Sequence, residues 1–179
     1  MDLSTDSFFF DTDALSAFLW INNQSILTKL FPGQIVIPKE VYDELNIPSV
    51  PHLKERIDAL ITSKEAKMGY IYEGTDEYAL YKKLTTPSED KSKKVIGKGE
   101  ASSIALAKFT GGTLVSNNLK DVLVYVKEYD LKHLTVADIF KLAFDREIIT
   151  EEEGNTLWDM MLKKRRLLGY PSFSDFLKQ

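Results

Sequence analysis

Short, mostly apolar runs alternate along the chain with longer stretches in which apolar residues recur every three or four positions. Two of these runs, Phe8–Phe10 and Gln34–Ile37, predict buried strands, and Thr113–Ser116 predicts a third strand. Leu134–Thr135 marks the end of a further short strand, and Tyr70–Tyr72 is one more candidate strand. The pattern therefore indicates a sheet whose strands are separated by helices.

The stretches between these strands carry helix-boundary residues. Asp13 is expected to cap the first helix, Pro38 to open the helix that follows the second strand, and Thr75 to cap a helix that runs to Leu84. Thr150–Glu153 forms a capping-box sequence before an amphipathic helix that is expected to reach Leu168. The predicted helices are 14–20, 26–30, 38–45, 53–61, 76–84, 99–110, 121–127, 136–143, 151–168 and a last short one after Ser172.

Strands that alternate with helices favour a parallel sheet covered on both faces. We therefore expect an α/β protein with a three-layer α/β/α architecture and a central, mainly parallel sheet. The 179 residues predict a single domain, 1–179, with a C-terminal helical extension over about 136–179. No apolar run approaches the roughly 18 residues that a membrane span requires.

Composition restricts the chemistry that is open to this chain. Apolar residues make up 44% and charged residues 28%, which is typical of a globular protein. The sequence contains no cysteine, which excludes disulfides, thiolate metal sites and a cysteine nucleophile. The formal net charge of −4 is unlike that of a general nucleic-acid coat, so any polyanion must meet a local basic patch or a metal. Residues 1–10 contain no basic residue, so we expect no signal peptide and a cytoplasmic protein.

Acids and an amide stand where the predicted strands end or where helices begin. Asp11 follows the first strand, Glu100 opens a helix, and Asn118 and Asp121 follow the Thr113–Ser116 strand. Glu44 lies about two turns into the helix after the second strand. In parallel α/β sheets, sites form at the carboxyl ends of the strands, and carboxylates crowded there require a cation. Oxygen ligands alone suit Mg²⁺ or Mn²⁺. Each acid taken singly also fits a helix cap, a helix start or a solvated helix face.

Four segments together resemble the motifs of PIN-domain nucleases, which include VapC-type toxins of toxin–antitoxin pairs. They are Phe8–Thr12, Ile37–Leu45, Gly97–Ala107 and Thr113–Asp121, and each contains one of the candidate acids or the amide. The Gly-x-Gly-Glu-Ala form and the tail Arg165–Tyr170 are similar to an uncharacterised PIN-like subfamily. The likeness covers most of residues 7–140. It implies a metal-dependent endoribonuclease that hydrolyses RNA phosphodiester bonds, with an RNA substrate and an antitoxin protein as a further partner.

The resemblance also implies a role for each residue. Asp11 and Glu100 would bind the metal, and Asp121, or Asn118 through a water molecule, would complete its coordination. Glu44 would orient or deprotonate the attacking water. Many family members have an aspartate where this chain has Asn118, so the amide adds no charge to the site. Two hydroxyl residues are expected to hydrogen-bond a ligand carboxylate: Thr12 and Ser116.

Basic residues near the predicted site are candidates for binding RNA phosphates. Lys91, Lys93, Lys94 and Lys98 precede Glu100, although a solvated loop explains these four slightly better, and Lys120 precedes Asp121. The run Lys163–Arg166 is the other basic cluster, and a solvated helix face explains it better than RNA binding does. The apolar faces of 156–168 and of Phe18–Ile26 fit either a homodimer or antitoxin surface or the core.

Two other functions compete with the nuclease. A PIN-like scaffold would bind RNA or protein with weak or no catalysis, and Asn118 favours this interpretation. Asp11-Thr12-Asp13 also resembles the opening of haloacid-dehalogenase-type phosphatases. However, Leu15 stands where those enzymes have a threonine, and no later strand ends in the acidic pair that would bind their Mg²⁺.

Overall fold

A computed structural model describes residues 6–87 and 94–179 of the chain. In this structure a five-stranded sheet has the order β3-β2-β1-β4-β5, and every neighbouring pair is parallel. The strands are β1 (Phe8–Phe10), β2 (Ile35–Pro38), β3 (Ala66–Gly69), β4 (Thr113–Val115) and β5 (Lys132–Leu134). All the carboxyl ends of the strands therefore lie at one edge of the sheet.

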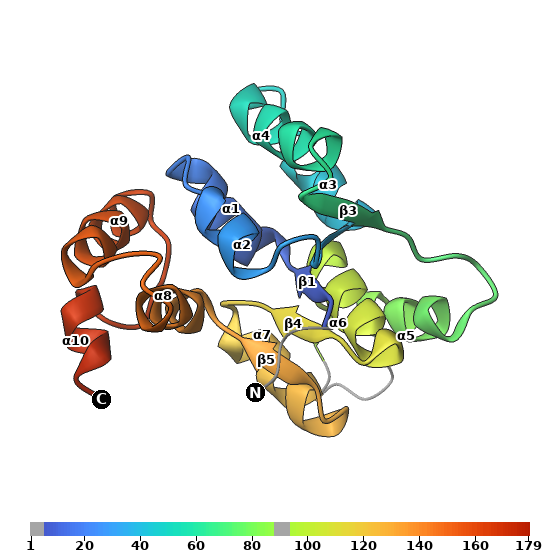
Figure 1. Ribbon diagram of the computed structural model, residues 1–179. Coiled ribbons are helices and arrows are strands. Elements are labelled where there is room, and N and C mark those ends of the chain that lie inside the picture. Colours follow the sequence, from blue (N-terminus) through green and yellow to red (C-terminus); the bar gives the residue numbers. More distant parts are fainter. Residues whose placement is uncertain (1–5, 88–93) are drawn as a thin grey trace.

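Helices connect the strands and cover both faces of the sheet (Figure 1). The first six are α1 (Thr12–Trp20), α2 (Ser25–Leu30), α3 (Lys39–Leu45), α4 (Pro51–Thr62), α5 (Asp76–Thr85) and α6 (Lys98–Thr110). The others are α7 (Leu119–Glu128), α8 (Val136–Asp145), α9 (Glu151–Lys163) and α10 (Phe173–Leu177). The expected α/β fold with three α/β/α layers is confirmed. None of the helices in the described residues is long and apolar enough to cross a membrane.

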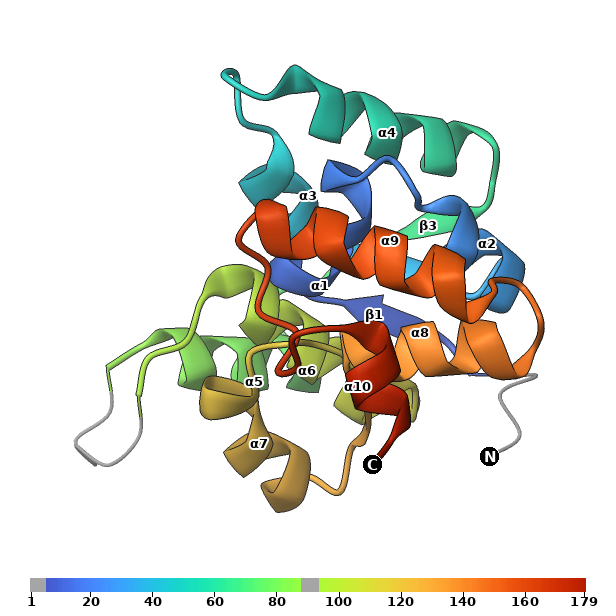
Figure 2. The same cartoon turned by 90° about the vertical axis from the view of Figure 1, so that its left-hand side faces the viewer.

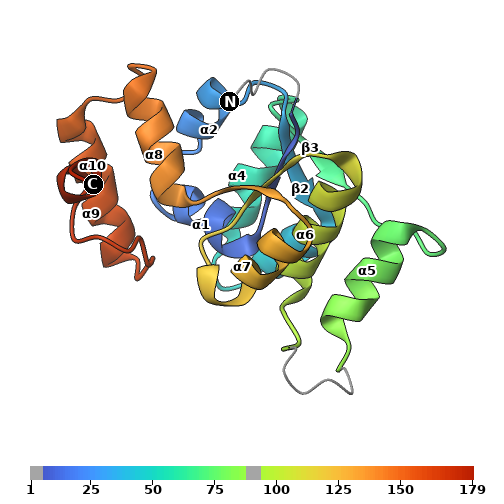
Figure 3. The ribbon, with the colours of Figure 1, turned by 90° about the horizontal axis from the view of Figure 1, so that it is seen from below.

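Alternate residues of each central strand enter opposite hydrophobic cores. Phe8 and Phe10 belong to the core that includes α1, α2 and α8, whereas Phe9 belongs to the core formed with α5, α6 and α7. Val36 and Leu114 join the second core beside Phe9. Figure 3 shows the two helical layers on either side of the strands. Burial on both faces explains why these strands are apolar at every position.

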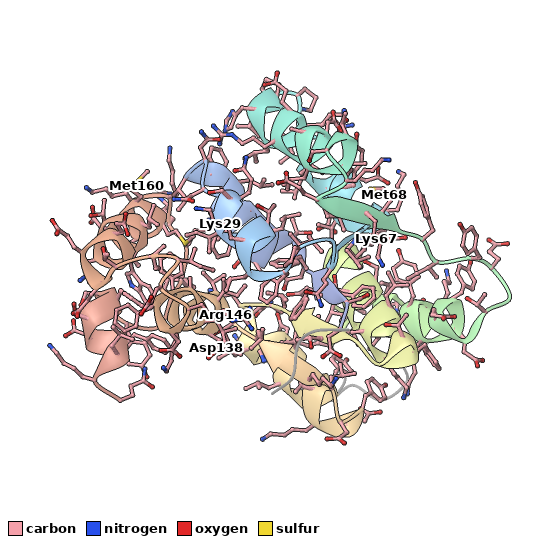
Figure 4. All side chains as sticks on the ribbon, viewed as in Figure 1. Lys29, Lys67, Met68, Asp138, Arg146 and Met160 are labelled. Carbon is pink, nitrogen blue, oxygen red and sulfur yellow. The ribbon has the colours of Figure 1, made fainter. Side chains whose placement is uncertain are left out.

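The C-terminal helices share the first of these cores. Phe140 of α8 stacks on Phe18 of α1 with ring centroids 6.0 Å apart, and Trp158 of α9 is fully buried. Figure 2 shows α9 running across α1, with α8 and α10 beside it. Arg146, which Figure 4 labels at the end of α8, donates a hydrogen bond to the Leu30 carbonyl of α2 (3.2 Å). The apolar positions of 156–168 and Phe18–Ile26 that were candidates for a protein interface are to a large extent this core.

Three details of the predicted elements are wrong. The strand expected at Tyr70–Tyr72 is instead Ala66–Gly69, whose register places Gly69 beside Pro38 of β2. The helix expected to reach Leu168 ends at Lys163, because Arg165 adopts a left-handed conformation that no α-helix continues. Asp11 rather than Asp13 caps α1, since its Oδ1 accepts the Ala14 N–H at 2.7 Å.

Candidate active site

Asp11 lies at the centre of the carboxyl edge of the sheet and is completely buried. It directly follows β1, and its backbone N–H donates to the Val115 carbonyl of β4 at 3.0 Å, which fixes the residue between the two strands. Oδ1 caps α1, but Oδ2 is buried and has no hydrogen-bond partner of ordinary geometry among the described residues. A buried carboxylate oxygen without a partner is costly, which makes this atom unusual in the fold.

The surroundings of Asp11 disfavour its charge. Its pKa is raised to about 7, chiefly by burial and to a smaller extent by the charges of Asp13 and Glu100. The Ser116 hydroxyl and the Ala14 N–H act in the opposite direction and lower the pKa. Near neutral pH the Asp11 carboxyl is therefore only partly ionised, unless a positive charge enters the site.

Glu44 is held at the beginning of α6. The Gly99 N–H donates to its Oε1 at 2.9 Å, and the Thr12 hydroxyl donates to Oε2. This end of α6 carries the positive end of the helix dipole, which favours a carboxylate there. A Cβ atom at position 99 would lie 2.6 Å from Glu44 Oε2, so only glycine lets the carboxylate approach α6 this closely. Thr12, expected to support a metal ligand, is hydrogen-bonded to Glu44 in this structure.

Glu100, Asn118 and Asp121 form a hydrogen-bonded chain beside Asp11. The Asn118 side-chain nitrogen donates to Glu100 Oε1 at 2.6 Å and to Asp121 Oδ2 at 3.0 Å. Burial raises the pKa of Glu100, the Asn118 hydrogen bond lowers it, and the charges of Asp121 and Glu44 raise it again. The structure thus brings together all five residues that the sequence proposed from four distant segments: Asp11, Glu44, Glu100, Asn118 and Asp121.

Asp121 faces the solvent side of this chain. Its pKa is lowered by the Asn118 hydrogen bond and by Lys94, whose Nζ lies 3.3 Å from Oδ1, and Lys120 lowers it as well. Lys94, Lys98 and Lys120 are exposed, and Lys98 begins α6 two residues before Glu100. Lys91 and Lys93, which the sequence proposed for RNA binding, lie outside the described residues.

The side-chain oxygens that gather here are of the chemical type that a hard divalent cation prefers as ligands. The oxygens of Asp11, Glu100, Asn118 and Asp121 are ligands of the kind that Mg²⁺ and Mn²⁺ bind, and Asp11 Oδ2 is a buried oxygen in need of a partner. As arranged, however, no three acidic or histidine side chains of the described residues could hold an ion together. The Asn118 amide nitrogen joins the two carboxylates instead, so this side chain would have to turn before a cation could bind between them.

A C-terminal segment that the sequence did not place in the site lies against it. Arg166 donates to Asp13 Oδ1 at 2.8 Å and to the Ser16 hydroxyl at 3.1 Å, both on α1. The Asn117 side chain donates to the Leu167 carbonyl, and its Oδ1 accepts the Val136 N–H at 3.2 Å. The sequence signals for this segment were the basic run Lys163–Arg166, which a solvated helix face explained better, and the resemblance of the tail Arg165–Tyr170 to a PIN-like subfamily.

Two cavities of this structure lie away from the acids. One, of about 440 Å³, lies between α2 and the start of α9 and is lined by residues that include Lys29, Glu152 and Leu157. Figure 4 labels Lys29 on α2. The other, of about 240 Å³, lies between α2 and α4. Neither includes any of the candidate site residues.

The fold and site define a parallel α/β protein whose acidic residues gather at the carboxyl edge of the sheet. A family model described as a PIN domain matches residues 7–179. The chain therefore belongs to the PIN-domain family, which has a nuclease fold. A comparison with curated proteins found no match.

Proposed function

We propose that the protein is a cytoplasmic endoribonuclease that depends on a divalent metal ion, Mg²⁺ or Mn²⁺. The observation that carries the proposal is Asp11, a fully buried acid with a raised pKa and an oxygen that has no hydrogen bond of ordinary geometry, next to the charge of Glu100. Membership of the PIN-domain family supports the same activity.

In this proposal each residue has a distinct task. Asp11 and Glu100 would hold the ion, and Asp121 or the Asn118 amide oxygen would complete its surroundings. A bound ion would supply positive charge that offsets these carboxylates and the developing charge on the scissile phosphate. Glu44, held by Gly99 and Thr12, would accept a proton from the attacking water.

Cleavage of RNA by the purified full chain tests the proposal. We expect cleavage with Mn²⁺, none with chelator, and a loss of at least about 100-fold in Glu100→Gln, because groups that merely orient metal ligands are already worth about 10- to 100-fold. Glu55→Gln is the matched control, since Glu55 is an exposed residue of α4. Cleavage that persists in chelator and in Glu100→Gln would refute the proposal.

A non-catalytic RNA-binding scaffold is the second candidate. Its support is Asn118, which links Glu100 and Asp121 by hydrogen bonds through its amide nitrogen. RNA binding without cleavage in Mg²⁺ or Mn²⁺ would favour the scaffold over the enzyme. A phosphatase of the haloacid-dehalogenase type has less support, because Asp13, its acid/base, is paired with Arg166.

The role of toxin and an antitoxin partner are further parts of the proposal that rest on the family resemblance, whereas the proposed homodimer rests on the apolar faces of 156–168 and Phe18–Ile26, most of which the fold buries. Co-expression with a small protein encoded beside the gene tests the first two. Growth arrest by the chain alone, relieved by that neighbour, is the result expected of a toxin and its antitoxin.

A further inference from the structure

Lys164–Leu167, here termed the rim segment, joins the two parts of the chain that carry Asp11 and Asn118. Arg166 donates a hydrogen bond to Asp13, two residues after Asp11. The Leu167 carbonyl accepts a hydrogen bond from Asn117, the neighbour of Asn118. The Lys164 ammonium also lies 5.4 Å from the centroid of the Trp20 ring on α1. The rim segment therefore borders the acidic site, and its position is fixed from both sides.

The basic side chains in and beside the rim segment differ in what they contact. Lys163 is paired with Asp159 at 2.6 Å, Lys164 lies over Trp20, and Arg166 is paired with Asp13. Arg165 is exposed and has no ion pair or ring contact among the described residues. The two flanking residues are thus occupied by the protein itself, while the guanidinium of Arg165 is free to meet a ligand.

Arg165 also occupies a backbone conformation that favours glycine. Its φ is 59°, and it directly follows Lys164, the residue that ends α9. Its N–H donates to the Leu162 carbonyl (2.8 Å) and the Arg166 N–H to the Met161 carbonyl (3.0 Å), which is the usual hydrogen bonding of a helix end. The left-handed backbone conformation raises the free energy of a residue that has a Cβ atom, whereas glycine adopts it without this cost. Lys64 shares this conformation, so the backbone fixes where Arg165 lies, and the case for a bound ligand rests on its exposed guanidinium beside the acidic site.

We propose that Arg165 binds a backbone phosphate of single-stranded RNA next to the scissile bond, an inference that rests on the proposed function. Four carboxylates face the site, namely Asp11, Glu44, Glu100 and Asp121, and they repel a polyanion that approaches them. Arg165 on one border and the exposed Lys98 at the start of α6 supply the positive charge that such an approach requires. A guanidinium also matches a phosphate with paired hydrogen bonds.

The chain offers a closely matched control at Lys64. Lys64 is exposed, has φ 63° and follows the end of α4. Its N–H donates to the Ile61 carbonyl (3.1 Å), and the Glu65 N–H donates to the Leu60 carbonyl (3.0 Å). It repeats the hydrogen bonds, the left-handed backbone and the charge of Arg165. Because β3 begins at Ala66, Lys64 lies at the amino edge of the sheet, opposite the acids.

The test compares Arg165→Gly with Lys64→Gly in the full chain carrying Glu100→Gln, so that RNA is bound and not cleaved. Binding of a fluorescein-labelled single-stranded RNA is followed by anisotropy over a salt series. Both glycine variants should have a melting temperature about 2–4 °C above that of the parent chain. In each, glycine removes the cost of holding a side-chain-bearing residue in the left-handed conformation. Arg165→Gly alone should weaken binding about three- to tenfold and reduce the salt slope of log K by about 0.7, the value of one phosphate contact. Arg165→Lys should keep the slope.

The outcomes separate this inference from the proposed function. If Arg165→Gly and Lys64→Gly bind RNA with the same affinity and slope, Arg165 binds no phosphate, even if the wild-type chain cleaves RNA. If the wild-type chain cleaves no RNA but RNA binding depends on Arg165, the phosphate contact is supported and the proposed nuclease function is refuted. Failure of every form to bind RNA overturns both.

Discussion

The carboxyl edge of the sheet and the C-terminal helices α8–α10 satisfy their polar groups very differently. In the helices, Thr135 with Asp138 and Thr150 with Glu153 form reciprocal capping boxes, and Ser172 caps α10. At the carboxyl edge, two buried carboxylate oxygens among the described residues lack a hydrogen bond of ordinary geometry, Oδ2 of Asp11 and Oε2 of Glu40 in the first turn of α3.

This difference indicates which region stabilises the fold and which is arranged for binding. Full pairing of caps and a tight aromatic cluster lower the free energy of the folded state. Crowded, partly unpaired carboxylates raise it, and such arrangements are retained where a ligand or a reaction needs them. Substitutions should therefore lower stability in the helices, whereas at the edge they should abolish function and leave stability equal or higher.

The largest effect on stability is expected from Trp158→Ala. Trp158 is fully buried among Phe140, Phe173 and Phe176, and its Nε1 donates to the Tyr170 carbonyl at 3.0 Å. The free energy of unfolding should fall by about 3–5 kcal/mol in urea titrations, since a large cavity forms and the carbonyl loses its donor.

Met160→Ala on the same helix is the control for this experiment. Its side chain lies on the exposed face of α9 and is 39% accessible (Figure 4). It should change the unfolding free energy by less than about 0.5 kcal/mol. If Trp158→Ala cost no more than Met160→Ala, the C-terminal helices would not be part of the cooperative fold.

A smaller effect, with a pH signature, is expected from Asp11→Asn. The pKa of Asp11 rises from 3.8 to about 7 on folding, so between these values the folded protein binds more protons than the unfolded chain. Stability of the metal-free protein should therefore fall as pH rises from about 4 to about 7, by up to about 4 kcal/mol from this group. Asp11→Asn, which keeps an N-cap oxygen, should remove that part of the slope.

Urea titrations in chelator at a series of pH values measure this slope for both proteins. The difference between them isolates Asp11 from other titrating groups. A variant with the same pH dependence as wild type would mean that Asp11 ionises as easily in the fold as in the unfolded chain, which contradicts the contrast between the two regions.

The sequence predicted the layered fold because burial on both faces imposes a local pattern. Phe8–Phe10 is apolar at every position for that reason, and Thr75 and Thr150 identify helix starts by their cap chemistry. Ala66–Gly69 escaped prediction because it is an edge strand with an exposed Lys67 and a half-buried Met68, so it lacks a continuous apolar run. The periodicity of the sequence continues to Leu168, but α9 ends at Lys163. The left-handed backbone of Arg165 and the hydrogen bonds of Arg166 and Leu167 to other segments are not visible in that periodicity.

The candidate site was predictable in its members and unpredictable in its bonding. Parallel strands bring residues that follow them to one edge, so Asp11 and Asn118 could be expected to meet. Nothing in the sequence shows that the Asn118 amide bridges Glu100 and Asp121, or that Gly99 is needed beside Glu44, because both depend on atomic positions from distant segments.

Mn²⁺ binding by isothermal titration calorimetry at pH 8, where Asp11 is largely ionised, tests most directly whether these carboxylates hold a cation. We predict one ion bound per chain, with affinity reduced at least about tenfold in Asp11→Asn and in Glu100→Gln and unchanged in Glu55→Gln. Equal affinity in all four proteins, or no binding by the wild-type chain, would contradict the account.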